Sequence, residues 1–506
     1  MNTRIRSVLI ANRGEIAVRI IRACREMGIR TVAIYSEADR SAPHVLTADE
    51  AYPVGPAPSS ESYLRMEAII EVAKRADCDA IHPGYGFLSE NAEFNRAVTN
   101  AGLTFIGPTA DAIKIMGDKT SARTLMIERG VPVVPGTERA VTSGEEARSI
   151  ALKVGYPILL KAAAGGGGKG MRVVTEETQL LKALESAQNE ARSAFGDERV
   201  YIEKYVLEPR HVEIQVLADA HGNCIHLGER ECSIQRRHQK VVEEAPSVIV
   251  DEELRTRMGQ AAVEAARACG YVNAGTIEFL VDNHRNFYFL EMNTRLQVEH
   301  PVTEMVTGVD LVKMQIRVAE GHVLPMKQED IRFRGHAIEC RICAEDVRND
   351  FLPDTGTILR YRPPFGFAVR DDSGVTEGSE ISIHYDPMFA KLVVWGMDRE
   401  DAIRKMRRAL DEFVIDGVET TIPFCRFVMD HPAFIKGDFR IDFVEKHYQP
   451  GFLRKPQADE SRAAALAAVL TEMDRTTGSA LSSNGKGTHD HRCSPWLLLH
   501  RQGGTR

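Results

Sequence analysis

The chain of 506 residues is long enough for two to four domains, each with its own core. With 43% hydrophobic residues, 27% charged residues and a formal charge of −8, its composition is that of a globular protein and gives no reason to expect nucleic acid or a membrane as a partner. There is no run of 18 apolar residues, no hydrophobic leader before the first predicted strand, and the nine cysteines are scattered, which together favour a reducing cytoplasm.

The N-terminal part predicts a parallel sheet covered by helices. Residues 7–11 form a buried-strand pattern, apolar residues repeat at helical spacing between residues 16 and 27, and residues 31–35 form the next strand. The turn at residues 12–14 lacks the glycine fingerprint of dinucleotide-binding folds, which disfavours an NAD oxidoreductase. The loop at residues 82–87 follows a second strand, where such sheets bind ligands, although a plain tight loop fits equally well.

A run of glycines at residues 165–168 lies between two predicted strands, residues 158–162 and 171–174. It is not a Walker A loop, because no Gly-Lys-Ser/Thr opens a helix after it. Glycine amides on a hairpin can close over phosphate groups, and Lys161 and Lys169 add positive charge. The alternatives are a phosphate-binding flap and a floppy linker, and the flanking strands and lysines favour the flap.

The middle of the chain alternates strands and a helix. Residues 201–206 and 211–216 are strand-like, and residues 252–269 predict an amphipathic helix that ends at Gly270. The densely polar stretch at residues 229–240 fits an exposed charged loop, but it also carries the cations that an anionic substrate would need.

The stretch at residues 276–293 predicts a β-hairpin with its loop at residues 283–286. In the simplest register Asp282 pairs with Phe287, which places Glu278 directly opposite Glu291, with Cβ atoms about 5 Å apart. Two bare carboxylates there would repel by about 3 kcal/mol at an effective dielectric near 20, and a bound cation or a proton would relieve this repulsion.

The second strand of this hairpin is predicted to continue in alternation to residue 299. Its even positions are mostly apolar, and its odd positions are Glu291, Asn293, Arg295, Gln297 and Glu299. This polar row fits either a solvated strand face or a site. In a site, Glu278, Glu291 and Asn293 offer oxygen ligands to Mg²⁺, and Arg295 can bind an oxyanion.

Beyond residue 335 the pattern changes to short strands, such as residues 336–344 and 356–361, and a helix at residues 398–413. Cys340 and Cys343 form a C-x-x-C pair, but structural zinc usually needs a second such pair and the two thiols of a strand would face opposite sides, so zinc is discounted. Arg341 between them is the better candidate, as an anion contact.

Several motifs together resemble the biotin carboxylase family. They are Ile-Ala-Asn-Arg-Gly-Glu-Ile-Ala at 10–17, His-Pro-Gly-Tyr-Gly-Phe-Leu-Ser-Glu-Asn at 82–91, Met-Gly-Asp-Lys at 116–119, the glycine run, Arg-Arg-His-Gln-Lys-Val-Val-Glu-Glu-Ala-Pro at 236–246, and Glu-Met-Asn-Thr-Arg-Leu-Gln-Val-Glu-His-Pro-Val-Thr-Glu at 291–304. The resemblance implies an α/β ATP-grasp fold. Its expected parts are a Rossmann-like domain at 1–115, an ATP-grasp domain at 116–330 with a lid at 133–204, a β-rich C-terminal domain at 331–450 and a flexible tail at 451–506.

The resemblance also implies site residues. The expected ATP contacts are Lys119, Lys161, Gly167, Gly168, Glu203, Lys204, Tyr205, Val206, His211, Gln235, His238, Glu278, Leu280, Glu291 and Ile441. The expected ligands of Mg²⁺ or Mn²⁺, as two ions, are Glu278, Glu291 and Asn293. The expected bicarbonate and biotin contacts are Lys240, Arg295, Gln297, Val298, Glu299 and Arg341. Among these, Lys240, Arg295, Glu299 and Arg341 are the expected catalytic residues, with Glu299 as the base and Arg341 stabilising the biotin enolate.

The family uses ATP and bicarbonate to make carboxyphosphate and then carboxylates biotin, as the first half-reaction of acetyl-CoA or other acyl-CoA carboxylases, including those of fatty acid biosynthesis. The implied partners are a biotin carboxyl carrier protein that brings biotin in trans, a carboxyltransferase subunit and a second copy of the chain. Alternatives are another ATP-grasp ligase with an amine or carboxylate acceptor, and a non-catalytic paralogue that scaffolds a carboxylase complex. Cys343 is a departure, because many relatives have Asn there.

Overall fold

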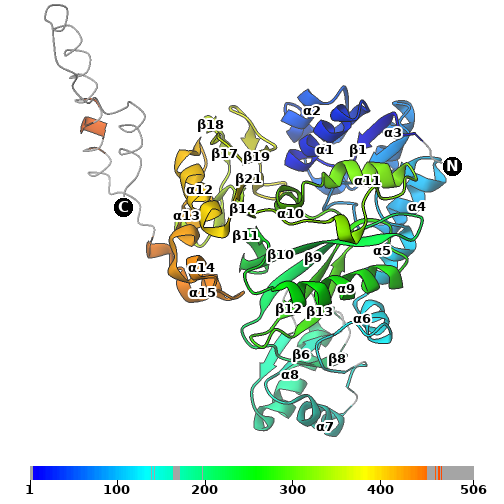
Figure 1. Ribbon diagram of the computed structural model, residues 1–506, viewed down its shortest axis with the longest axis vertical. Helices are drawn as coiled ribbons and strands as arrows, with labels where there is room; N and C mark the ends of the chain where they lie inside the picture. Colours follow the sequence, from blue (N-terminus) through cyan, green and yellow to red (C-terminus); the bar gives the residue numbers. More distant parts are fainter. Residues whose placement is uncertain are drawn as a thin grey trace, which may run out of the picture.

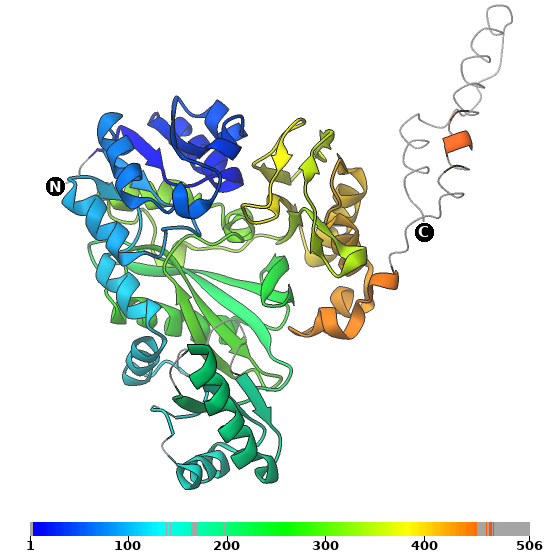
Figure 2. The same ribbon diagram turned by 180° about the vertical axis from the view of Figure 1, so that it is seen from behind.

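The computed structural model describes residues 4–137, 139–141, 143–162, 171–195 and 198–452, together with residues 462, 465–467 and 469. Figure 1 shows an N-terminal region in blue, a central green sheet with a teal subdomain beyond it, and a yellow-to-orange C-terminal region on the other side of the sheet; Figure 2 shows the same arrangement from behind. The predicted glycine run and most of the predicted tail lie outside the described residues.

The N-terminal region is a five-stranded parallel sheet with strand order β3-β2-β1-β4-β5. Its strands are β1 (Ser7–Ile10), β2 (Arg30–Ser36), β3 (Glu50–Gly55), β4 (Ala80–His82) and β5 (Thr104–Phe105). Its helices are α1 (Gly14–Glu26), α2 (Pro43–Thr47), α3 (Met66–Arg75), α4 (Ala92–Asn100) and α5 (Ala110–Gly117). All four residues of β1 are buried, as expected for a parallel strand covered on both faces, and the predicted βαβ unit is confirmed.

The central sheet is antiparallel and has eight strands in the order β13-β12-β9-β10-β11-β14-β21-β19. The strands are β9 (Arg210–Ala218), β10 (Cys224–Arg236), β11 (Gln239–Ala245), β12 (Asn273–Val281), β13 (Phe287–Asn293), β14 (His336–Cys343), β19 (Val369–Ser373) and β21 (Met388–Gly396). The accompanying helices are α9 (Glu252–Ala268), α10 (His300–Thr307) and α11 (Leu311–Ala319). The polar stretch 229–240 is therefore not an exposed loop. It forms the end of the β10–β11 hairpin, and most of its β10 side chains are buried.

A smaller antiparallel sheet forms the teal subdomain, with strand order β7-β6-β8. Its elements are β6 (Ile158–Ala162), β7 (Met171–Val174), β8 (Val200–Lys204), α7 (Gly144–Val154) and α8 (Leu180–Phe195), and α6 (Lys119–Glu128) precedes it. It has its own apolar core, which includes Leu160, Leu184 and Ile202. The predicted hairpin around the glycine run is confirmed for its two strands, and the strand predicted at 201–206 ends at Lys204.

The C-terminal region packs helices and short strands against β14 and β21. The helices are α12 (Arg399–Glu412), α13 (Ile422–Asp430), α14 (Pro432–Lys436) and α15 (Phe443–His447). The strands are β15 (Glu345–Asp346), β16 (Leu352–Pro353), β17 (Gly356–Thr357), β18 (Arg360–Arg362), β20 (Glu380–Ile381) and β22 (Val414–Asp416). The prediction of a single strand at 356–361 is wrong. The segment contains β17 and the start of β18, which pair with different strands, β20 and β22. Short 3₁₀ turns lie at Glu37–Asp39, Ser59–Glu61, Glu177–Gln179, Gln328–Asp330, Val347–Asn349 and Pro450–Phe452.

The β12–β13 hairpin confirms one predicted pairing and corrects another. Glu278 lies opposite Glu291 as predicted, but Phe287 pairs with Val281 and not with Asp282. A shift of register after Glu278 leaves Leu290 as the extra residue on β13 and compensates for the misplaced turn.

The strand predicted to reach Glu299 ends at Asn293. Beyond it, the Thr294 backbone N–H and the Arg295 guanidinium each donate a 2.9 Å hydrogen bond to Glu90 of the N-terminal region, so the backbone leaves the sheet. Helix α10 then begins at His300. None of the described helices is both long and apolar enough to cross a bilayer.

Candidate active site

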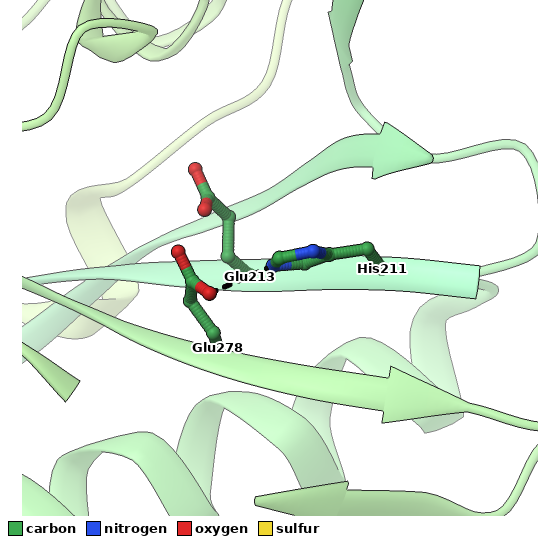
Figure 3. A group of neighbouring side chains, drawn as sticks. All are labelled: His211, Glu213 and Glu278. Atoms are coloured by element: carbon green, nitrogen blue, oxygen red, sulfur yellow. Dashed lines mark ion pairs between the residues drawn. The ribbon is translucent and has the colours of Figure 1, made fainter. Parts of the chain in front are cut away.

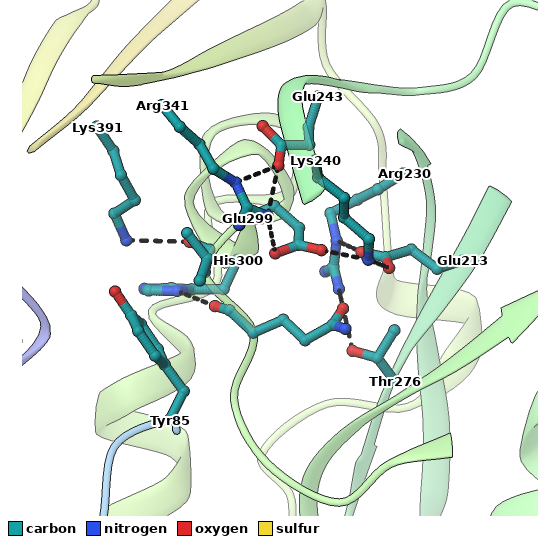
Figure 4. Close-up of polar contacts among 12 residues, drawn as sticks. Tyr85, Glu213, Arg230, Lys240, Glu243, Thr276, Glu299, His300, Arg341 and Lys391 are labelled. Atoms are coloured by element: carbon teal, nitrogen blue, oxygen red, sulfur yellow. Dashed lines mark hydrogen bonds and ion pairs between the residues drawn. The ribbon is translucent and has the colours of Figure 1, made fainter. Parts of the chain in front are cut away.

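Arg230 is the most extensively hydrogen-bonded buried side chain described for the site, and sequence analysis did not single it out. Its side chain on β10 is fully buried and uses all of its nitrogens. It donates to five side-chain oxygens, those of Glu213, Gln215, Thr276, Gln297 and Thr303. The clean alternation of polar residues along β9 was the pattern that could have pointed to a buried polar partner. Arg230 ties β9, β12 and the segment around α10 together beneath the site (Figure 4).

Lys240 on β11 lies at the centre of three carboxylates. Its Nζ donates to Glu213 Oε2 at 2.6 Å, Glu278 Oε1 at 2.9 Å and Glu299 Oε1 at 2.6 Å. Burial opposes the lysine charge, but the three carboxylates outweigh it and raise the pKa of Lys240 well above its usual value. Lys240 is therefore a fixed cation, and Glu213 is a site residue that the sequence analysis missed.

Glu299 is held by two cations from different strands. Its Oε1 accepts from Lys240, and its Oε2 accepts from Arg341 Nη2 at 2.9 Å (Figure 4). Arg341 also donates from Nε to Glu243 Oε1 at 2.6 Å. Burial would raise the pKa of Glu299, but Lys240 and Arg341 hold it well below its usual range. Two of the residues expected to bind bicarbonate and biotin, Lys240 and Arg341, thus converge on a third, Glu299.

The predicted metal ligands also come together. Glu278 Oε1 accepts from Asn293 Nδ2 at 2.9 Å and from Gln297 Nε2 at 3.0 Å, and Glu291 lies directly across the hairpin. Burial and the charge of Glu278 raise the pKa of Glu291, which forms an ion pair with Lys119 Nζ at 3.8 Å. A divalent cation between the two acids would relieve this repulsion, so the donor set fits Mg²⁺ or Mn²⁺.

Two further donors lie beside Glu278. His211 Nε2 is 3.0 Å from Glu278 Oε2, and ligand atoms of His211, Glu213 and Glu278 all lie within 4.8 Å of one another (Figure 3). Burial lowers the pKa of His211, but the charge and hydrogen bond of Glu278, together with the charge of Glu213, outweigh burial and raise the pKa above its usual value. His211, expected as an ATP contact, is therefore also part of the cation-binding face.

The expected ATP contacts are spread over two sheets. Lys161 Nζ lies 2.5 Å from Glu203 Oε2 in the small sheet. Lys204 Nζ donates to the carbonyls of Gly155 and Tyr156 at 2.8 and 3.1 Å, so its ammonium is turned towards the lid backbone. Tyr205 and Val206 follow β8 on the way to β9, and Gly167 and Gly168 lie outside the described residues.

The remaining expected contacts lie on the large sheet and at its edge. Gln235 pairs across the β10–β11 hairpin with Lys240, and His238 sits in its turn at a φ of 67°. Leu280 on β12 pairs with His211 on β9. The Ile441 N–H donates to the carbonyl of Pro209 at 3.2 Å.

Two expected bicarbonate contacts are fixed by residues that the sequence analysis did not name as site residues. Arg295 donates to Glu90 at 2.9 Å and to Asn293 Oδ1 at 3.0 Å. The carbonyl of Val298 accepts from Lys391 Nζ at 3.0 Å. Glu90 lies in the loop motif at 82–91, and Lys391 reaches Val298 from β21.

Comparison with known proteins places this geometry in a family. Three family models match in chain order: "Biotin carboxylase, N-terminal domain" at residues 4–113, "Carbamoyl-phosphate synthase L chain, ATP binding domain" at 118–327 and "Biotin carboxylase C-terminal domain" at 339–446. Biotin carboxylase 1 of Bacillus subtilis is 56% identical over 444 residues, which cover 88% of this chain and 99% of that protein.

Two further relatives carry different names. The propionyl-CoA carboxylase alpha chain of Ruegeria pomeroyi is 49% identical over 521 residues, covering 98% of this chain and 76% of that protein. The biotin carboxylase domain dimer of the Hydrogenobacter thermophilus 2-oxoglutarate carboxylase, solved with MgADP, ADP and bicarbonate, superposes with a TM-score of 0.82 at 50% identity, covering 90% of this chain and 99% of that one. The predicted ATP-grasp fold is confirmed, and the chain belongs to the biotin carboxylase family.

Proposed function

We propose that this protein carboxylates biotin on a biotin carboxyl carrier protein, with ATP and bicarbonate as substrates and ADP as a product. The observation that carries the proposal is the convergence of Lys240 and Arg341 on the buried carboxylate of Glu299. It combines a carboxylate base with two fixed cations for anionic substrates. The relative from Hydrogenobacter thermophilus, whose structure contains MgADP and bicarbonate, supports the same substrates.

We assign the parts of the reaction to the parts of the fold. Residues 1–115 form the N-terminal domain, 116–330 the ATP-grasp domain with its lid at 133–204, and 331–450 the C-terminal domain. ATP would bind between the lid sheet, which carries Lys161 and Glu203, and the large sheet, which carries His211 and Leu280. Closure of the lid would exclude water, which otherwise hydrolyses carboxyphosphate.

Glu278, Glu291 and Asn293 would hold the divalent cation, two ions being expected. Bound there, the cation would neutralise charge on the transferred phosphoryl group. Lys119 and Lys161, two further cations of this region, would orient the phosphates.

Bicarbonate would bind between Lys240 and Arg295, near Gln297 and the backbone of Val298. In the resting site Glu299 is a weak base, because two cations stabilise its charge. An entering anion would engage the same cations, loosen their hold on Glu299 and raise its basicity. Glu299 would then take the bicarbonate proton onto a carboxylate oxygen.

Arg341 would stabilise the biotin enolate, whose oxygen carries the negative charge once the N1′ proton has passed to phosphate. The guanidinium is preorganised for this role, because Glu243 and Glu299 hold it in place before the substrate arrives. Cys343, two residues along β14, is half-buried, and desolvation raises the pKa of its thiol well above the usual value.

The acyl acceptor and the assembly extend the proposal. We propose an acyl-CoA such as acetyl-CoA as the final acceptor, selected by a partner carboxyltransferase, and a homodimer in the cytoplasm. The exposed apolar side chains of Phe365, Phe367 and Met397, 75%, 81% and 80% exposed, would suit a protein contact. All eight cysteines in the described part of the chain are unpaired, in keeping with a reducing compartment.

The test is ADP release by the purified protein with Mg²⁺, with and without bicarbonate and with and without free biotin. We expect release to require bicarbonate and to rise with biotin. Release indifferent to both would favour another ATP-grasp ligase, and no release at all would favour a scaffold protein. Adding separate acyl-CoA carboxyltransferases with a biotinylated carrier would then identify the acceptor.

A further inference from the structure

Two buried acids face each other beside Arg341. Glu243 on β11 and Glu339 on β14 are direct cross-strand partners, which places their Cβ atoms about 5 Å apart. Both side chains are completely buried. One oxygen of Glu243 binds Arg341 (Figure 4), whereas its Oε2 and both oxygens of Glu339 have no hydrogen-bond partner among the described residues.

The surroundings of Glu339 favour one proton on this pair. The charged groups that act on it most strongly are Glu243 from β11, Arg341 on its own strand, Lys391 from β21 and Glu299 from the start of α10. The phenol of Tyr85 also interacts with its charge. Burial, the strongest influence, raises the pKa of Glu339 well above its usual value, and the neighbouring acids add to the effect. Burial also raises the pKa of Glu243, to about 7, but Arg341 favours its charged form. Above the pKa of Glu243, therefore, Glu339 is neutral and Glu243, which Arg341 binds, is the anion.

This arrangement creates a problem for an incoming enolate. Arg341 is already bound by Glu243 and Glu299, so a third anion must displace one of them. A displaced Glu243 would be an unpaired buried anion, which is strongly unfavourable. A proton from Glu339 would remove that cost. The charge would then lie on Glu339, diagonally across the strand pair from Lys391.

We propose that Glu243 and Glu339 share one proton, and that its transfer from Glu339 to Glu243 releases Arg341 for the biotin enolate. The O–H bond of Glu339 breaks and an O–H bond forms on Glu243, with no proton taken from solvent. Glu339 is thus a positioning residue that acts through Arg341. The inference rests on the enolate-stabilising role proposed above for Arg341.

The test is the substitution Glu339→Gln, which keeps the size of the side chain and removes its transferable proton. Glu243 must then take a proton from water, so biotin carboxylation should fall about tenfold at one pH unit above the pKa of Glu243 and recover as the pH is lowered. A loss of equal size at every pH, or no loss, would overturn the inference.

Introducing Glu339→Gln into the Glu243→Gln variant distinguishes an effect of proton transfer from an effect of packing. In Glu243→Gln the group facing Arg341 is already neutral, so adding Glu339→Gln should change the biotin carboxylation rate little further. If Glu339→Gln caused the same fold-loss in both backgrounds, Glu339 would act through packing and the inference would fail. Thermal unfolding midpoints of the wild-type protein, the two single variants and the double variant would show whether all four fold.

Infrared difference spectra test the resting proton without relying on turnover. The difference between the wild-type protein and Glu339→Gln should contain a band of a protonated carboxylic acid. Its absence would mean that Glu339 is ionised, which overturns the inference. If instead the wild-type protein itself shows no biotin-dependent turnover, the proposed function fails, and the infrared result still decides where the proton lies.

Discussion

Replacing Glu299 with Gln separates the chemistry of the site from its stability. The amide keeps the size of the side chain but cannot take a proton, and it can satisfy only one of the two cations, Lys240 and Arg341, that now bind the carboxylate. One lost hydrogen bond to a charged group costs about 1.5–3 kcal/mol of stability. Loss of a general base lowers the rate by about 10²–10⁴-fold, or about 3–5 kcal/mol in activation free energy.

The assay is bicarbonate-dependent ADP release, measured beside the dissociation constant for ATP. We expect turnover to fall by the factor given above while ATP still binds. Glu304→Gln is the matched control. Glu304 lies further along α10, is also buried, and is bound by two cations, Arg19 at 2.8 Å and Arg370 at 2.7 Å. Equal losses of turnover in both variants would mean that the effect is one of stability, and unchanged turnover in Glu299→Gln would remove Glu299 as the base.

Three other predictions concern residues of the same fold. Arg341→Ala should lower biotin carboxylation far more than bicarbonate-dependent ATP cleavage, and equal losses in the two assays would place Arg341 in the ATP step. Arg230→Met leaves the buried carboxylate of Glu213 without its closest arginine, so the free energy of unfolding should fall by about 3–5 kcal/mol. Calorimetry would record this as a lower thermal unfolding midpoint. An unchanged midpoint would contradict the stabilising role of Arg230 in the site. His44 is fully buried, and burial, partly offset by Asp39, lowers its pKa to about 4 from an ordinary value of 6.5. Because the unfolded chain then binds the proton more readily, stability should fall by about 1.4 kcal/mol per pH unit as the pH drops from 6.5 towards 4, and His44→Gln should flatten that decline in unfolding curves measured across this range.

The sequence predicted those features of the fold and the site that depend on the local alternation of side chains along a strand. Glu278 and Glu291 were found opposite each other because side chains alternate on a strand, and the misplaced turn at Asp282 did no harm because the bulge at Leu290 restored the register. The extension to Glu299 was wrong for a non-local reason. Glu90, about two hundred residues earlier, draws the backbone at Thr294 out of the sheet.

Residues fixed by long-range pairing could not be found in this way. The five partners of Arg230 come from three segments of the chain, namely β9, β12 and the segment around α10, and no spacing in the sequence brings them together. The pairing of Glu243 with Glu339 depends on β11 lying beside β14, which local patterns do not show. Glu243 lies in the motif at 236–246, but its chemistry with Glu339 appears only when the two strands are aligned.

Because β11 pairs with β14, which lies about 90 residues later in the chain, the large sheet cannot assemble in the order in which its strands are synthesised. A nascent chain can complete its five-stranded parallel sheet once Phe105 has emerged, but the large sheet waits for β21, which ends at Gly396. Until β14, which ends at Cys343, has emerged, the edge of β11 that faces away from β10 has no neighbour. Such distant strand pairing slows folding and leaves an unpaired edge open to aggregation. During translation this protein therefore carries a half-built site, a state in which a chaperone would be of most use.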